Sequence, residues 1–132
     1  MTVFVDTSAL VALLDASEGR HQAAADAWKT LLHEDSALVT SSYVMVETYA
    51  LVQRRLGLDA ARTLTADIMP LVTIDWVDES VHGAGLAALL TANRRHLSLV
   101  DCVSFEVMRR RDLTHALALD GDFSTQGFTV MP

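Results

Sequence analysis

The chain alternates short apolar runs with longer stretches in which apolar residues recur every three or four positions. The short runs predict buried strands, and the longer stretches predict amphipathic helices. We expect strands at residues 2–5, 37–40, 71–74, 115–119 and 128–130. We expect helices at residues 9–14, 20–33, 43–56, 58–67, 78–93 and 98–110. Because strands alternate with helices, the pattern predicts βαβ units and a parallel sheet with helices on both faces.

This alternation gives the fold class, an α/β sandwich of three layers around a central parallel sheet of four to five strands. A chain of 132 residues is long enough to bury about two thirds of its unfolded surface as one domain. No composition shift, repeat or linker divides it, so we expect a single domain over residues 1–132. The alternation does not give the order of the strands in the sheet.

The first strand carries the first candidate for chemistry. Val3, Phe4 and Val5 end abruptly at Asp6, and such a run is typical of a strand buried on both faces. Asp6 therefore lies at the carboxyl end of a strand, where open α/β sheets bind ligands. Alternatively, Asp6 or Thr7 only caps the helix that follows.

Two further acids lie among apolar residues of predicted helices. Glu47 shares a helix face with Val44 and Leu51, although it could also be partly exposed with its stem packed on apolar neighbours. Asp101 shares a stripe with Phe105, but Ser98 three residues before it matches a capping box. Capping and a role in a site can coexist at Asp101.

The last acids follow the fourth predicted strand in the run Asp120-Gly121-Asp122. Asp-Gly is a common turn dipeptide, so a plain turn explains the run. However, a turn needs only one Asp, and here two Asp residues flank the Gly. The sequence leaves open whether Asp120 or Asp122 belongs to a site.

The charge and cysteine content narrow the function classes. The net charge of −7 argues against broad, non-specific binding to nucleic acid. Cys102 is the only cysteine, which excludes an internal disulfide and fits a reducing compartment. The start of the chain lacks a signal-peptide pattern and no apolar run could span a membrane, so we expect a cytoplasmic protein.

The basic residues are mostly arginines in short clusters. Lys29 is the only lysine among ten basic residues, and arginines occur together at 54–55, 94–95 and 109–111. Such clusters can bind phosphates with bidentate geometry. They are equally typical of solvated helix ends that complement the helix dipole.

Acids that converge at strand ends need a counter-charge, because like charges a few ångströms apart destabilise each other. The chain has almost no lysine to supply it, and its histidines show no metal-binding spacing. Oxygen ligands without Cys or His point to Mg²⁺ or Mn²⁺. Ions held by carboxylates activate water and stabilise charge in phosphoryl displacement.

Four motifs in order give the chain a resemblance to a known family. They are Val5-Asp6-Thr7-Ser8-Ala9-Leu10, Glu47-Thr48, Leu97-Ser98-Leu99-Val100-Asp101, and Ala118-Leu119-Asp120-Gly121-Asp122-Phe123 with Gly127-Phe128. Together they resemble the PIN domain, and their size and order look like the VapC toxins of bacterial toxin–antitoxin modules. The resemblance covers essentially the whole chain and implies a Mg²⁺- or Mn²⁺-dependent endoribonuclease, a hydrolase that cuts RNA phosphodiesters with a metal-activated water.

The resemblance also implies roles for particular residues. Asp6, Glu47, Asp101 and Asp120 would form the acidic site, with Asp122 as a possible fifth acid. Asp6 and Asp101 would be the direct metal ligands, and Thr7 or Ser8 would orient a carboxylate or water. The implied partners are an RNA substrate, a small cognate antitoxin and a second copy in a homodimer. Arg94 and Arg95 are candidates for holding RNA.

Other classes fit less well. A receiver domain needs a late lysine and only Lys29 is present, a two-aspartate phosphatase needs an acid where Ser8 stands, and a dinucleotide-binding fold needs a glycine-rich turn. Gly83-Ala84-Gly85 lies inside a predicted helix and is better explained as a close-packing site. The remaining alternative is a catalytically silent PIN-like module that binds protein or RNA.

Overall fold

The computed structural model describes residues 1–132. Its strands are β1 (Thr2–Val5), β2 (Ala37–Ser41), β3 (Thr73–Asp75), β4 (His115–Leu117) and β5 (Thr129–Met131). Its α-helices are α1 (Thr7–Leu14), α2 (His21–His33), α3 (Ser42–Leu56), α4 (Leu58–Thr63), α5 (Glu79–Ala92), α6 (Leu99–Arg110) and α7 (Asp122–Thr125). A π-helical turn, η1 (Leu64–Ile68), and a 3-10 turn, η2 (Met69–Leu71), connect α4 to β3.

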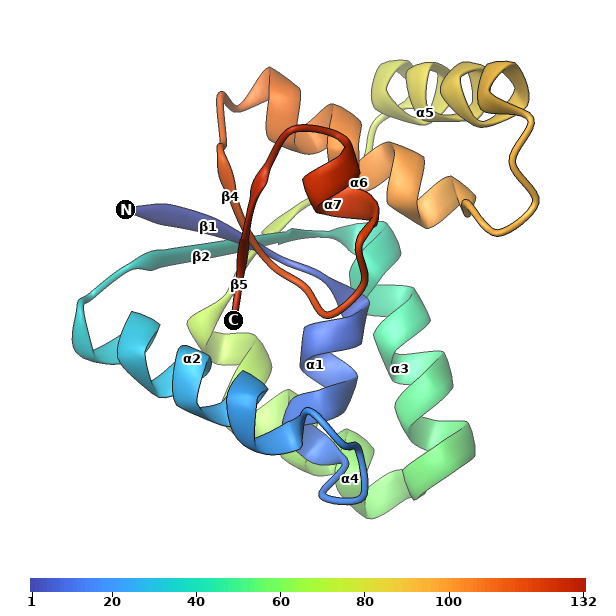
Figure 1. Ribbon diagram of the computed structural model, residues 1–132. Coiled ribbons are helices and arrows are strands. Elements are labelled where there is room, and N and C mark those ends of the chain that lie inside the picture. The colour runs from blue at the N-terminus through green and yellow to red at the C-terminus, as the bar shows by residue number, and fades with distance from the viewer.

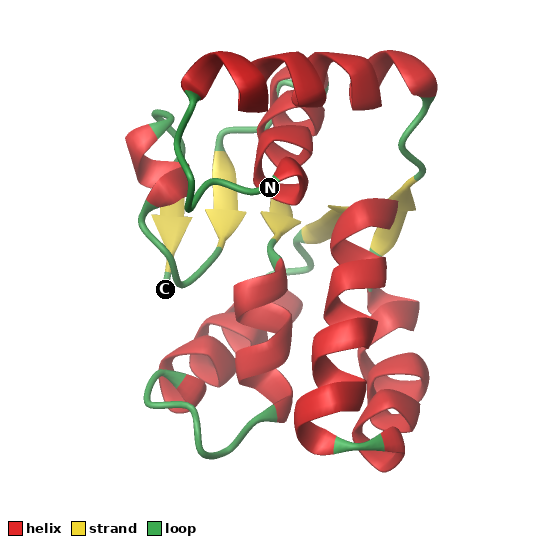
Figure 2. Ribbon diagram, turned by 90° about the vertical axis from the view of Figure 1, so that its right-hand side faces the viewer, coloured by secondary structure: helices red, strands yellow, loops and turns green.

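The five strands form one parallel sheet in the order β3-β2-β1-β4-β5. Figure 1 shows α1 to α4 gathered on one side of this sheet and α5 to α7 on the other. Figure 2 shows the same three layers from the side, with helices above and below the strands. The predicted three-layer α/β sandwich is therefore confirmed, and the sheet has five strands.

The strand order places a switch point beside β1. The chain builds outward from β1 through β2 to β3, then crosses back to add β4 on the other side of β1. Open α/β sheets bind ligands at such a point, outside the carboxyl ends of the strands. Asp6 directly follows β1 and Asp120 follows β4 three residues after its end, so both acids belong to this edge.

The core surrounds β1, whose Val3, Phe4 and Val5 are fully buried as the sequence predicts. Phe123 from α7 packs against Phe4 and Phe105, with ring centroids 6.1 and 5.0 Å away respectively. This short helix is not predicted by the sequence, because Asp-Gly indicates only a turn there. Burial of the Phe123 ring stabilises it, since an isolated four-residue helix would not form in water.

Some element boundaries differ from the prediction. The third strand begins at Thr73 rather than at residue 71, because Pro70 lies in the η2 turn and that turn includes Leu71. The fourth strand ends at Leu117, two residues early. The helix expected over 58–67 is α4 followed by the π-helical turn η1. In each case the apolar pattern is right and local backbone geometry sets the boundary.

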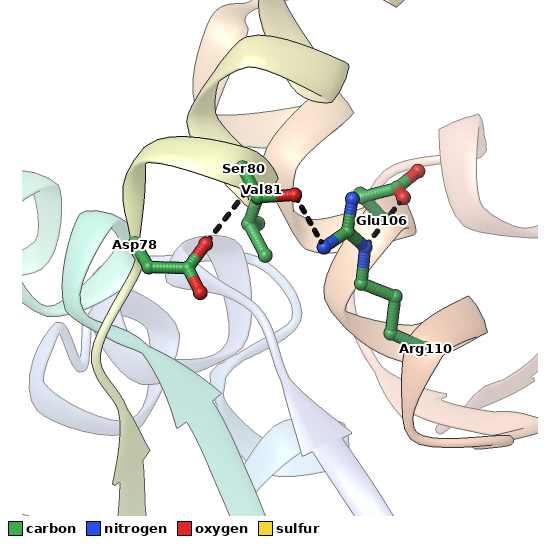
Figure 3. Close-up of polar contacts among 5 residues, drawn as sticks. All are labelled: Asp78, Ser80, Val81, Glu106 and Arg110. Atoms are coloured by element: carbon green, nitrogen blue, oxygen red, sulfur yellow. Dashed lines mark hydrogen bonds and ion pairs between the residues drawn. The ribbon is translucent and has the colours of Figure 1, made fainter.

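The largest difference concerns α5, which was predicted as an amphipathic helix over residues 78–93. Only Gly85 is buried, while Ala88 and Ala92 are exposed, because α5 packs mainly on α6 and lies at the periphery (Figure 1). Arg110 of α6 helps to hold the two helices together. Its guanidinium donates to Ser80 Oγ at 3.0 Å and to Glu106 Oε1 at 2.8 Å (Figure 3).

Candidate functional site

A cavity of about 420 Å³ lies at the carboxyl ends of the strands, next to the switch point. Its walls come from the start of α1, the loop after α1, one face of α3, the start of α6 and the segment after β4. The acids that line it are Asp6, Glu18, Glu47, Asp101 and Asp120. Four of these five acids were predicted from the sequence, and they come from four separate segments of the chain.

Asp6 is the most buried of these acids, with 2% of its surface exposed. It is the N-cap of α1, and its Oδ2 accepts hydrogen bonds from the Ser8 backbone N at 3.2 Å and from Ser8 Oγ at 2.6 Å. The other carboxylate oxygen, Oδ1, receives no hydrogen bond from the protein. The capping role and a place in the cavity therefore coexist at Asp6.

Ser8 connects the ends of two neighbouring strands. Its hydroxyl donates to Asp6 Oδ2 and accepts from the Leu119 backbone N at 2.9 Å. The backbone N of Asp6 donates to Leu117 O at 2.9 Å, which extends the pairing of β1 with β4 by one residue. These bonds fix the Asp6 carboxylate relative to the segment that carries Asp120.

The environment of Asp6 disfavours its charged form. Burial raises its pKa to about 7, the Ser8 hydrogen bonds oppose that rise, and Asp120 and Asp101 add to it through repulsion. The pKa of Asp120 is also raised, first by partial burial and then by Asp101, Asp122 and Glu47, while the Asp122 amide opposes it. The cavity therefore lacks the positive charge that would balance its carboxylates.

Asp101 lies in the first turn of α6 and completes a capping box with Ser98. The Ser98 backbone N donates to Asp101 Oδ2, and the Asp101 backbone N donates to Ser98 Oγ, each at 3.0 Å. Asp101 Oδ1 receives no protein hydrogen bond, although the residue lines the cavity. Asp101 thus repeats the arrangement of Asp6, with one oxygen capping a helix and the other unbonded.

Glu47 reaches the cavity from α3, which follows β2 directly. Ser41 ends that strand and caps the helix, because its hydroxyl accepts from the Val44 backbone N at 3.1 Å. Glu47 is half-buried and makes no hydrogen bond with the protein. Its carboxylate is therefore free to bind water or a ligand in the cavity.

The structure distinguishes the two acids around Gly121. Asp120 lines the cavity, whereas Asp122 does not. Asp122 is the first residue of α7, and its backbone N donates to Asp120 Oδ1 at 3.2 Å. Asp122 thus helps to orient Asp120 through its backbone amide, and the structure does not bring its side chain into the cavity.

Sequence reasoning missed two residues of the site, Glu18 and Arg55. Glu18 lies in the polar loop after α1, where no pattern distinguishes it. Arg55 lies eight residues after Glu47 on α3, and helical periodicity alone could not have singled it out, because the seven-residue spacing of Arg54 lies closer to the direction of Glu47. Arg94 and Arg95, the predicted RNA-binding arginines, instead line a separate surface depression at the end of α5.

The donor set suits a hard divalent cation. Apart from the Arg55 guanidinium, every polar side-chain group that lines the cavity is a carboxylate or a hydroxyl, and both present oxygen atoms to a metal ion. One of these hydroxyl oxygens, Thr7 Oγ1, is buried and has no hydrogen-bond partner. No three His, Cys, Asp or Glu side chains are close enough to form a cage by themselves. Mg²⁺ commonly binds through one or two carboxylates and completes its shell with water and substrate phosphate, so the residues fit it.

Comparison with protein families gives a match to the PIN domain over residues 3–128. Among curated proteins, the chain is 35% identical to the 23S rRNA-specific endonuclease VapC20 of Mycobacterium tuberculosis. That alignment covers 127 residues, 96% of this chain and 95% of the relative. The match thus spans all four acid-bearing segments.

Solved structures show the same fold. The crystal structure of Mycobacterium tuberculosis VapC20, described as a sarcin–ricin loop cleaving toxin, superposes with a TM-score of 0.85 at 35% identity, covering 98% of this chain and 99% of that one. FitAcB from Neisseria gonorrhoeae gives 0.71 at 18% identity, covering 100% and 97%. VapBC2 from Rickettsia felis, bound to promoter DNA, gives 0.72 at 11% identity, covering 98% and 97%. With a family match over nearly its whole length and a relative of this similarity, the chain belongs to the PIN-domain family of nucleases.

Proposed function

We propose that this protein is a VapC-type toxin, an endoribonuclease that requires Mg²⁺ or Mn²⁺ and folds as one domain over residues 1–132. The observation that carries the proposal is the convergence of Asp6, Glu47, Asp101 and Asp120 on one cavity. The two most distant of these residues, Asp6 and Asp120, are 114 positions apart in the sequence. Packing alone would not favour a gathering of like charges. The arrangement is supported by the similarity to VapC20, whose name identifies it as an endonuclease.

Asp6 and Asp101 would hold the divalent ion, each through the oxygen that its helix cap leaves unbonded. The bound ion would supply a water of lowered pKa and would neutralise charge at the phosphate being cut. Glu47 and Asp120 would accept hydrogen bonds from water in the cavity and orient it toward that phosphate. Ser8 would keep Asp6 in position, because its hydroxyl donates to Asp6 Oδ2.

The proposed substrate is structured RNA, with 23S rRNA as the first candidate. This choice follows the relative named as a 23S rRNA-specific endonuclease, which is 35% identical over 96% of the chain. The structural similarity covers 98% of this chain, so most of the chain, from which the cavity is built, lies within it. The acidic cavity would accept an RNA phosphate only after a divalent ion has compensated its carboxylates.

The proposed partners are a small cognate antitoxin and a second copy of the chain. The solved structures of similar fold include toxin–antitoxin pairs, namely VapBC2 and FitAB. For the homodimer, α5 offers exposed apolar side chains, with Leu86 38% and Leu90 70% exposed. We place the activity in the cytoplasm, where RNA is available. None of the helices has the length and apolar character that a membrane span requires.

Cleavage of RNA with and without metal tests the proposal. Purified protein is incubated with ribosomes and with a synthetic sarcin–ricin hairpin, in Mn²⁺, Mg²⁺ or EDTA. We expect discrete cleavage with metal, none in EDTA, and none with Asp101→Asn. In parallel, either metal should raise the melting temperature of the wild type more than that of Asp101→Asn, because a ligand that binds only the folded state stabilises it.

The competing function is a silent PIN-like module that binds without cutting. Intact RNA in every metal condition, with a melting temperature insensitive to metal, would favour that module. A metal-dependent rise in melting temperature without cleavage of these RNAs would instead indicate a different substrate. The two readouts therefore separate failure of the site from an incorrect choice of RNA.

A further inference from the structure

Arg55 stands apart from the other basic residues of the chain. Of the ten arginines and lysines, it is the only one that lines the acidic cavity. It lies in the last turn of α3, on the same face as Leu51 and Glu47, which also line the cavity at spacings of four and eight residues. Arg54, its neighbour in the sequence, does not line the cavity.

The Arg55 guanidinium is not committed to any protein partner. It makes no hydrogen bond and no ion pair, whereas Arg62, Arg110 and Arg111 each form a salt bridge. The charge of Arg55 contributes to lowering the pKa of Asp15, after the larger effect of the Ser17 hydrogen bonds. Arg20 does not line the cavity, and its guanidinium already donates to Leu119 O at 3.0 Å. Arg55 is thus the free cation of the cavity.

The separation of Arg55 from Glu47 along α3 indicates which RNA phosphate Arg55 could contact. Eight residues separate it from Glu47, which corresponds to about 12 Å of helix axis. Side chains of a helix lean toward its N-terminus, and this is the direction in which Glu47 lies from Arg55. A phosphate bound among the acids and a phosphate bound by Arg55 would therefore be different phosphates of one strand.

We propose that Arg55 binds an RNA phosphate flanking the phosphate that is cut, and so positions the strand across the acidic cavity. The inference rests on the proposed nuclease function and deepens it. Five acids and one arginine line this cavity. The carboxylates would repel the phosphates of an approaching RNA strand, whereas a bound divalent ion and Arg55 would attract them. The guanidinium offers a planar fork of donors that matches phosphate geometry.

The structure gives a matched control in Arg54. Arg55→Gln and Arg54→Gln remove the same charge from adjacent exposed positions, but only Arg55 lines the cavity. For cleavage of the sarcin–ricin hairpin, we expect Arg55→Gln to raise KM about tenfold or more with a much smaller change in kcat. Arg55→Lys should recover part of the loss, and Arg54→Gln should resemble the wild type.

Binding provides a test that does not depend on cleavage. The same substitutions are made in an Asp101→Asn background, and fluorescence anisotropy follows hairpin binding over a range of salt concentrations. Loss of one phosphate contact should reduce the slope of log affinity against log salt by about 0.7 to 1 for Arg55→Gln only. If the protein cuts no RNA but shows this difference, the proposed activity and the placement of Arg55 beside a cut phosphate are both refuted, and only phosphate binding by Arg55 remains.

Three results would overturn the inference: equal effects of Arg55→Gln and Arg54→Gln, an unchanged salt slope for Arg55→Gln, or no hairpin binding by any variant. If Arg55 serves only to offset the acids, Arg55→Gln should lower the melting temperature in EDTA and leave the salt slope as it is. That outcome would also overturn phosphate binding. Melting curves of each variant are therefore part of the experiment.

Discussion

The two proposed metal ligands are also helix caps. Asp6 caps α1 and Asp101 completes the capping box of α6, each with Oδ2 bonded to the backbone and Oδ1 free of protein hydrogen bonds. A capping bond holds a carboxylate in one orientation, because it fixes one oxygen against the helix end. The same bond that starts each helix therefore aims its unbonded oxygen, which is why capping and metal binding coexist at these positions.

The raised pKa of Asp6 predicts how the metal-free protein responds to pH. Between about pH 4 and pH 7 the folded chain keeps a proton on Asp6 that the unfolded chain has lost. The folded state then binds more protons, so the free energy of unfolding falls as pH rises through this window. The full loss is on the order of 4 kcal/mol. Urea unfolding in EDTA from pH 4.5 to 8 measures it.

The control for that experiment is Asp6→Asn. Asparagine keeps an oxygen for the Ser8 amide and is a good N-cap, but it does not titrate. Most of the pH dependence should disappear in this variant, with a remainder of the same sign from Asp120, whose pKa is also raised. Identical pH profiles for the wild type and Asp6→Asn would contradict the assignment of the buried proton to Asp6.

A pair of substitutions at Asp101 separates its two roles. Asp101→Asn keeps an acceptor for the Ser98 amide and removes a negative charge that faces Asp6 and Asp120, so we expect a higher melting temperature in EDTA. Asp101→Ala removes the cap as well and should be about 1 kcal/mol less stable than Asp101→Asn. Differential scanning calorimetry compares the three proteins. An Asn variant that melts below the wild type would mean that capping dominates.

At the level of elements, the close contact between α5 and α6 requires a glycine at position 85, because glycine has no Cβ. A Cβ added to Gly85 would lie 2.6 Å from Val103 Cγ2 and 3.2 Å from the Val103 backbone N. Val103 is fully buried in the core, so it has little room to move. The interpretation of Gly83-Ala84-Gly85 as a close-packing site is therefore right for Gly85, and Val81 and Leu89 of the same helix are partly buried against the core.

Alanine substitutions at two glycines of α5 should change the stability of the protein in opposite directions. Gly85→Ala should destabilise the protein by about 1–3 kcal/mol, because overpacking against Val103 outweighs the better helix propensity of alanine. Gly83→Ala, with nothing within 4 Å of its added Cβ, should stabilise it by up to about 1 kcal/mol. Urea unfolding of both variants measures the difference. Equal stabilisation by the two substitutions would show that α5 can move away from α6.

At the level of the whole molecule, the sheet order decides where the acids meet. Because β2 and β3 are added on one side of β1 and β4 on the other, the segments after β1 and β4 become neighbours although they are more than a hundred residues apart. The start of α6 and one face of α3 complete the same cavity. The site is thus a property of the assembled sheet and of no single element.

The proposed homodimer predicts a substitution that separates the two copies. Leu90→Glu on α5 should raise the dissociation constant of the dimer more than tenfold, because it removes a buried apolar contact and places two like charges at the interface. The control is Val46→Glu on α3, because the Val46 side chain is also apolar and is 64% exposed. Sedimentation velocity gives the populations. A dimer that tolerates Leu90→Glu but not Val46→Glu would move the interface to α3.

The sequence by itself determined the fold class and most of the candidate acids. Its apolar periodicity depends on local geometry, so it indicated the strands, the helices and the burial of β1. Acids directly after predicted strands could be expected to meet, because parallel strands end at the same edge. The capping box at Ser98 and Asp101 was also readable, since its residues are three positions apart.

Only the tertiary structure decided the rest. It separated Asp120 from Asp122, added Arg55 and Glu18 to the cavity, and placed Arg94 and Arg95 elsewhere. It also left α5 at the periphery and formed α7 around the Phe123 ring. These outcomes depend on the order of strands and on contacts between distant segments, which periodicity cannot encode because it reports one element at a time.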